Sequence, residues 1–172
     1  MVDSLLKRNP KIHPQLDFPD YKSSILRAPK NKKISFSSTT TEISGPVFNK
    51  NKIGKLDNDL TLNFSKNNTL PVGHKIIVYG TLSDQFSNPI DGALIEIWQA
   101  NSAGKYLHHN DKNIAPIDPN FAGCGRSITS SKGYYEFITI QPGPYPYPNR
   151  GIEWRPMHIH FSVFGKSFGQ RL

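Results

Sequence analysis

The sequence is short of several features that define large classes of protein. A single cysteine, Cys124, stands among 172 residues, which excludes an internal disulfide framework and is typical of a reducing compartment. No run approaches the roughly 18 apolar residues that a membrane-spanning helix needs. Residues 1–10 also lack the basic and then apolar pattern of a signal peptide. We therefore expect a soluble, cytoplasmic protein with no membrane partner.

Helical periodicity is scarce too, whereas turn-forming residues are plentiful, with 13 glycines and 14 prolines. This balance favours an all-β fold, and the spacing of strands and turns predicts a β-sandwich. Residues 1–45, broken by prolines, are predicted to form an extended N-terminal arm, and residues 46–172 the sandwich domain. Strands are expected at residues 74–80, 93–100, 127–129, 134–140 and 155–164.

Two long connections, residues 101–125 and 141–156, are predicted to be loops. Compact domains rarely carry loops of this length without a functional reason, so both are candidate site loops. Trp98, on the strongest predicted strand, is interpreted as a core residue, as are Phe137 and Ile140.

The net charge is positive and is unevenly distributed along the chain. The formal net charge is +8, and most of the excess lies within the first 55 residues. Such an arm could bind nucleic acid or an acidic partner. The lysines are scattered among Ser, Thr and Asn, however, without the interleaved aromatics of a nucleic-acid surface. A solvated leader with no nucleic-acid partner is the preferred interpretation.

A pair of histidines, His158 and His160, offers the clearest chemical signal. Side chains two apart on a strand share one face, so both imidazoles would point to one place, which suits a metal ion, while Ile159 would face into packing. The alternatives are two hydrogen-bonded buried histidines or a pair on a wet face. A second pair, His108 and His109, is expected to diverge on an extended segment and is interpreted as loop or rim residues.

The two long connections supply oxygen donors of a different kind. Tyr106 lies in the first of them and Tyr145 in the second, with Arg155 just before the histidine segment. A tyrosinate is a hard anionic ligand that favours Fe(III) over softer or less charged ions. Other combinations of tyrosine and histidine remain open on composition and spacing alone.

From about residue 20 to the last residue, the chain resembles the β subunits of protocatechuate 3,4-dioxygenases, which are ferric, intradiol ring-cleaving enzymes. The tyrosine loop together with the sequence Arg-Pro-Met-His-Ile-His is the most specific part of the resemblance. The matching segments are residues 20–24, 94–101, 104–106, 115–121, 133–135, 141–146 and 154–161.

The resemblance implies a role for particular residues. It places Arg155 beside the bound substrate ring, where it would stabilise developing negative charge. It makes Tyr145 the ligand that leaves iron and takes a substrate proton. It places Tyr21 and Tyr147 in the substrate pocket, although these β subunits carry tryptophan at the second position. It implies four protein ligands of non-haem Fe(III): Tyr106, Tyr145, His158 and His160.

The resemblance also implies an activity and a partner. The expected reaction is cleavage of protocatechuate by O2 to 3-carboxy-cis,cis-muconate, a step of aromatic catabolism in the β-ketoadipate pathway. The family assembles with a homologous α subunit, and the substrate pocket lies between the two chains. The alternatives are an intradiol dioxygenase that acts on catechol or hydroxyquinol, and a non-catalytic β-sandwich binding module of the transthyretin-like or carbohydrate-binding kind.

Family members continue well beyond the position of Leu172. By this resemblance the chain is expected to be C-terminally truncated, with the last strands of an intradiol-type β-sandwich missing. Unpaired strand edges and uncovered apolar faces would follow. We therefore expect this chain to be poorly stable and weakly active or inactive.

Overall fold

The computed structural model describes Phe18, Asp20 and residues 28–31, 53–67, 69–148 and 152–165. Within these ranges every regular element is a β-strand, and no helix there is long and apolar enough to cross a membrane. The predicted arm, residues 1–45, falls almost entirely outside the described residues, so its conformation stays a prediction. The strands are β1 Lys75–Thr81, β2 Leu94–Trp98, β3 Cys124–Ile128, β4 Tyr134–Ile140, β5 Tyr145–Pro148, β6 Ile152–Arg155 and β7 His160–Phe164.

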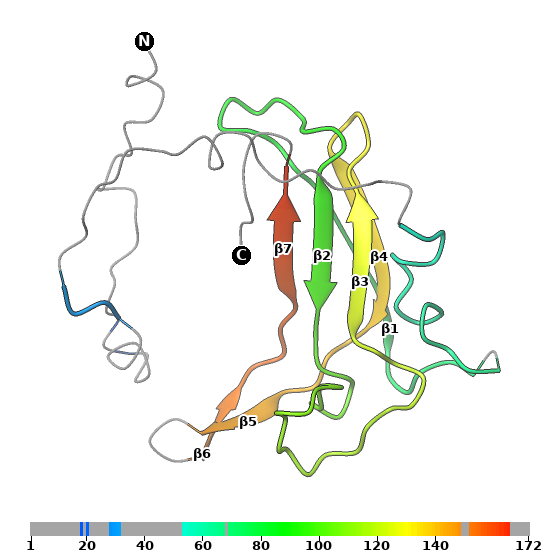
Figure 1. Cartoon of the computed structure of the whole chain (residues 1–172), viewed down its shortest axis with the longest axis vertical. Coiled ribbons are helices and arrows are strands. Elements are labelled where there is room, and N and C mark those ends of the chain that lie inside the picture. The colour runs from blue at the N-terminus through cyan, green and yellow to red at the C-terminus, as the bar shows by residue number, and fades with distance from the viewer. Residues whose placement is uncertain are drawn as a thin grey trace.

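The strands form two layers and a separate ribbon. Antiparallel β1 and β4 make one layer, and β3, β2 and β7, in that order and antiparallel, make the other. In Figure 1 the β1–β4 pair lies behind β2 and β3, while the short β5–β6 ribbon lies beyond the lower end of the three-stranded sheet. The all-β prediction is confirmed.

The core fills the space between the two layers. Ile95 and Ile97 alternate inward from β2, as the period of a strand requires, and meet Phe137 and Ile140 of β4. Leu60, in the turns that precede β1, is fully buried among them, and its amide donates to the Ile138 carbonyl. The core assignments of Phe137 and Ile140 are confirmed.

Two expectations about local structure were wrong. The segment 141–156 is not a plain loop, because β5 and β6 pair within it, with Pro146 opposite Trp154. Proline is tolerated there because each strand of an isolated two-stranded ribbon has a free edge. The histidine strand also begins later than predicted, since β7 starts at His160 and His158 precedes it.

Candidate functional site

One end of the three-stranded sheet brings together segments that are far apart in the sequence. Trp98, the last residue of β2, is paired in register with His160, the first residue of β7. Tyr145, the first residue of β5, is paired with Arg155, the last residue of β6. Figure 1 shows that the end of β2, the start of β7 and the β5–β6 ribbon all lie on this side of the molecule. The long connection after β2 lies there too.

The two histidines meet although only one of them is in a strand. Their Nε2 atoms are 3.2 Å apart. His158 Nδ1 lies 2.6 Å from the Pro156 carbonyl oxygen, which can only accept, so Nδ1 carries the proton and Nε2 of the neutral ring has a free lone pair. Ile159 packs against the core, as predicted.

His160 is held by its neighbours in a form that can bind a metal ion. Its ring stacks on Trp98, with 4.7 Å between centroids and 2° between planes. Burial, followed by the nearby His158 and Arg155, lowers the pKa of His160 below its ordinary value. The neutral imidazole, which is the ligand form, is thereby favoured.

Tyr145 lies beside the two histidines. Its hydroxyl lies 3.3 Å from His158 Nε2 and accepts a hydrogen bond of 3.2 Å from the Arg155 guanidinium. Arg155 also lies over the Tyr147 ring, 5.6 Å from its centroid. A cation in this position stabilises negative charge on the phenolic oxygen of Tyr145 and on anything bound beside it.

Tyr106 approaches from the other long connection. Its ring meets the Tyr145 ring edge-on, with centroids 5.3 Å apart. Its hydroxyl is buried and has no hydrogen-bond partner within the described part of the chain. Burial and the neighbouring Tyr145 raise the pKa of Tyr106 well above its ordinary value. A buried hydroxyl without a partner is costly, which makes this atom a candidate ligand.

The donor set fits a hard metal ion. Two ligands that each lie about 2.1 Å from one metal are about 3 Å apart, close to the separations found among Tyr145, His158 and His160. Within the described ranges, no three His, Cys, Asp or Glu side chains gather to hold a metal, so phenolic oxygens would be needed to complete this site. Two phenolates with two imidazoles suit a trivalent ion.

An open pocket of about 680 Å³ lies against the two tyrosines of this donor set. Tyr106, Tyr145 and Tyr147 line it together with Trp98 and His108. The rings of His108 and His109 lie 4.4 Å apart, so the expectation that they diverge was wrong; they stand in a turn, not on an extended segment. Tyr21, the other predicted pocket residue, lies outside the described residues.

Sequence reasoning missed some residues of the site and misjudged another. Trp98 is half-buried and lines the pocket instead of the core, because it alternates with the inward-facing Ile95 and Ile97 and so points to the opposite face of β2. Asp111 accepts the amide hydrogens of Tyr106 and Asn113 and pairs with Lys105. Burial alone would raise the pKa of Asp111, but these two amides and the Lys105 ammonium lower it below its ordinary value. Asp111 was not singled out from the sequence, where it is one of several polar residues of the long connection 101–125.

Comparisons with known proteins relate the chain to dioxygenases. The family model "Dioxygenase" matches residues 43–172, and the model "Protocatechuate 3,4-dioxygenase beta subunit N terminal" matches residues 6–39. The protocatechuate 3,4-dioxygenase beta chain of Burkholderia cepacia is 46% identical over 160 residues, covering 93% of this chain and 68% of that protein. A catechol 1,2-dioxygenase of Candida albicans is 34% identical over 105 residues, covering 55% of this chain and 33% of that one.

A solved structure supports the fold independently. The 3-chlorocatechol 1,2-dioxygenase of Rhodococcus opacus 1CP superposes with a TM-score of 0.52 at 24% identity, covering 77% of this chain and 55% of that one. This chain therefore spans about two thirds of the beta chain that it resembles and a smaller part of the other relatives. Taken together, the two family models and the 46% identical relative show that the chain belongs to the intradiol dioxygenase family, on the branch of the protocatechuate 3,4-dioxygenase beta subunits.

Proposed function

We propose that this chain carries the non-haem Fe(III) site of a protocatechuate 3,4-dioxygenase and takes part in the cleavage, by O2, of a catecholic ring between its two hydroxyls. The observation that supports this most is the contact of His158 Nε2 with both the Tyr145 hydroxyl and His160 Nε2, near Tyr106, whose buried hydroxyl has no hydrogen-bond partner in the described residues. When bound, Fe(III) supplies a Lewis acid and a template that holds both substrate oxygens.

The proposed role of Tyr106 is that of a permanent ligand. Its hydroxyl has no competing hydrogen-bond partner in the described residues, and its raised pKa keeps it protonated without a metal. Ionisation therefore requires the charge of the ion, and metal uptake would release its proton.

Tyr145 is proposed to accept a substrate proton, and Arg155 is proposed to stabilise negative charge. The Tyr145 phenolic oxygen, with Arg155 3.2 Å away, is placed to accept a proton from a substrate hydroxyl. Arg155 would then stabilise negative charge on the substrate ring, an electrostatic contribution that is often large in a pocket from which water is displaced. Tyr147 and Trp98 offer flat faces along which an aromatic ring can bind.

The proposed partners are protocatechuate, O2 and an α subunit. The relative from Burkholderia cepacia is named a beta chain, which implies a second kind of chain in that enzyme. An assembly of the same kind is proposed here, and Tyr21 is proposed to line the pocket with Tyr147.

The test is iron uptake followed by turnover. The purified protein is loaded with Fe(III), and we expect a visible charge-transfer band from tyrosinate to iron. Ring cleavage, which we expect to be weak in this chain, is followed as loss of ring absorbance with O2 consumption, and it should be faster with protocatechuate than with catechol or hydroxyquinol. H158A should abolish the band, whereas H109A, which removes an exposed histidine from the other pair, should leave it. A colourless protein, or a band that survives in H158A, would contradict the proposal.

A further inference from the structure

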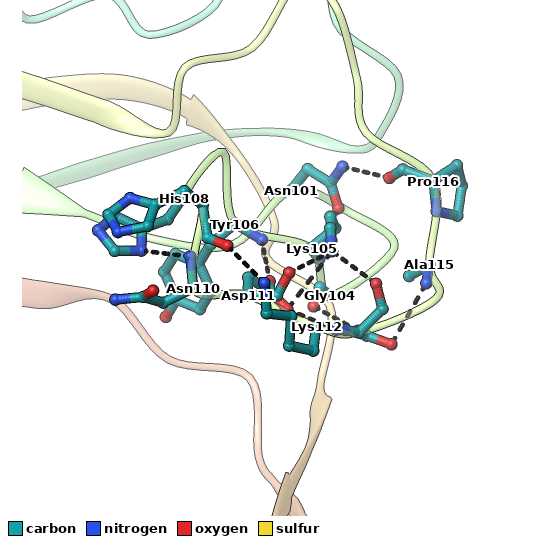
Figure 2. A network of polar contacts seen from close by, with 12 residues as sticks. Asn101, Gly104, Lys105, Tyr106, His108, Asn110, Asp111, Lys112, Ala115 and Pro116 are labelled. Atoms are coloured by element: carbon teal, nitrogen blue, oxygen red, sulfur yellow. Dashed lines mark hydrogen bonds and ion pairs between the residues drawn. The ribbon is translucent and has the colours of Figure 1, made fainter.

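The carboxylate of Asp111 lies at the base of the loop that carries Tyr106. Its two oxygens accept the amide hydrogens of Tyr106, at 2.8 Å, and of Asn113, at 2.7 Å. The side chain is only 14% exposed, so these bonds are largely shielded from water. Figure 2 shows this carboxylate between the Tyr106 amide and the Lys105 side chain.

Lys105 closes the loop around Asp111. Its ammonium lies 3.5 Å from a carboxylate oxygen of Asp111 and donates to the backbone carbonyls of Asp111 and Asn113, at 3.0 and 2.5 Å. Its side chain is 10% exposed. The residue before Tyr106 is therefore fixed by the same acidic group that holds the Tyr106 amide.

Asn101 joins this loop to the one that carries Tyr145. Its side-chain oxygen accepts the Lys105 amide at 2.9 Å, and its backbone carbonyl accepts the amides of Gly104 and Gly143 at 3.0 and 2.9 Å. Gly143 is two residues before Tyr145. The backbones on which the two phenols stand are thus held against each other.

The tip of Tyr106 has no such support. Within the described residues its hydroxyl makes no hydrogen bond to the backbone or to the loop that carries it, and the polar group that acts on it there is the Tyr145 phenol, which adds to burial in raising its pKa. The direction of the ring is therefore set by the position of its backbone together with the edge-on contact with the Tyr145 ring. Among the described contacts, the side-chain group that holds the Tyr106 amide is Asp111.

We propose that Asp111 is a positioning residue that fixes the backbone of Tyr106 and so aims its phenolic oxygen at the point shared by Tyr145, His158 and His160. The proposal rests on the proposed function, because it treats Tyr106 as a ligand of Fe(III). Partners that orient a metal ligand in this way are typically worth about 10- to 100-fold in metal affinity. They act through the ligand that they hold and are not themselves ligands of the metal.

The test compares D111N with D84N. Asp84 is a matched control, because it also accepts two backbone amides, those of Phe86 and Asn88, but in the turn between β1 and β2, away from the pocket. An asparagine side chain has only one acceptor oxygen. In D111N its NH2 group would therefore face one of the two backbone amides, and that hydrogen bond would be lost. Fe(III) affinity is measured by competition with a chelator, and each tyrosinate is observed by resonance Raman spectroscopy, with Y106F identifying the bands of Tyr106.

We expect D111N to weaken Fe(III) binding at least about 10-fold and to shift or weaken the Tyr106 bands, while the Tyr145 bands persist and D84N behaves as the wild type. Wild-type affinity and bands in D111N would overturn the proposal. If D111N does not fold, D111E decides in the same way, because it keeps the carboxylate and its charge but moves both oxygens away from the Tyr106 and Asn113 amides.

A measurement without metal separates this inference from the proposed function. Hydrogen exchange at the Tyr106 amide is followed by NMR in the iron-free protein. Exchange that is faster in D111N than in the wild type and in D84N supports the positioning role, and equal exchange overturns it. A wild-type protein that takes up no Fe(III) would refute the proposed function, and the exchange result would still decide the role of Asp111.

Discussion

At the scale of single residues, Trp98 packs against one face of the His160 ring. The two rings are almost parallel, at 2° and 4.7 Å, so the indole limits rotation of the imidazole toward the open pocket. Stacked aromatic pairs contribute about 0.5–1.5 kcal/mol beyond the area that they bury. The orientation of His160 thus depends on a residue of the neighbouring strand as well as on its own.

We expect W98A to lower the free energy of unfolding by about 2–3 kcal/mol, less than the 3–5 kcal/mol of a fully buried aromatic residue, because Trp98 is half-buried. It should also weaken Fe(III) binding, since His160 gains freedom. Urea unfolding and chelator competition measure the two effects. W98F keeps a ring over His160 and serves as the control; equal iron affinity in W98A and W98F would contradict this explanation.

The candidate site could be predicted from the sequence only in part. The spacing of His158 and His160 indicated a shared direction, and the structure brings their Nε2 atoms together even though β7 begins only at His160. Spacing alone did not select Tyr106 or Tyr145 from the other tyrosines; the resemblance did. Asp111 was missed because its partners depend on how a loop closes, which no periodic pattern encodes.

At the scale of elements, the two tyrosine-bearing connections interlock at Gly104. This residue has a φ of +78°, and a Cβ there would collide with the carbonyl oxygen of Pro144. Both the left-handed backbone and the close approach require glycine. The contact lies one residue before Tyr145 and two before Tyr106, so it sets the spacing between the loops.

We expect G104A to cost more than about 1 kcal/mol in stability and to abolish the iron band, because the Pro144 carbonyl must move. Gly133 provides the comparison, with a φ of +71° and a similar collision with the Leu82 carbonyl, but at the turn before β4. G133A should lose comparable stability and keep the band. Thermal unfolding and visible absorption measure both variants. Loss of the iron band in G133A but not in G104A would contradict the role of Gly104 in the iron site.

The turn between β1 and β2 should give a pH-dependent contribution to stability. Hydrogen bonds from the side chain and amide of Asn88 lower the pKa of Asp84 below 3.8, outweighing a small opposite effect of burial, and the Phe86 amide adds to the lowering. A carboxylate with a depressed folded pKa stabilises the fold above the unfolded pKa and loses this contribution as the pH falls through the folded value.

The wild type should therefore unfold at a higher temperature than D84N at pH 6, and the difference should shrink as the pH is lowered from 5 to 3. Calorimetric unfolding at each pH checks this expectation. D91N, which alters another aspartate of the β1–β2 connection, should keep a constant difference from the wild type. A gap between wild type and D84N that stays constant with pH would argue against the role of Asp84.

The element pattern shows where sequence reasoning stops. Alternating apolar residues predicted β1, β2 and β4 closely. The β5–β6 ribbon was missed because its prolines remove backbone donors and argue against a sheet, although a ribbon with a free edge accepts them. β3 begins at Cys124, earlier than expected, because its glycine and arginine lack the apolar alternation of a strand.

At the scale of the whole molecule, Leu60 joins the turns before β1 to the core between the layers. Its side chain is fully buried, and it lies against the place that a Cβ would occupy at Gly125 of β3. The same segment is bonded to β4 through the Leu60 amide and the Ile138 carbonyl. One leucine thus connects both sheets to a segment that has no strand of its own.

L60A should lower the free energy of unfolding by about 2–5 kcal/mol, because it leaves a cavity at the junction of the two layers. Leu62, which is 39% exposed in the same turn segment, is the matched control, and L62A should cost less than about 1 kcal/mol. Urea unfolding of both variants measures the difference. Similar losses in the two would show that the segment 53–67 is not anchored by Leu60.

The contact between Gly104 and Pro144 also limits how Tyr145 can move. The peptide just before Tyr145 packs tightly against Gly104, in the segment that carries Tyr106. The main chain at this position therefore cannot shift without displacing Tyr106 as well. Any exchange of the Tyr145 phenol between two positions must then occur by rotation about its own side-chain bonds. Such a swing leaves the scaffold undisturbed and can be repeated rapidly, so departure and return of this phenol need no opening of the fold.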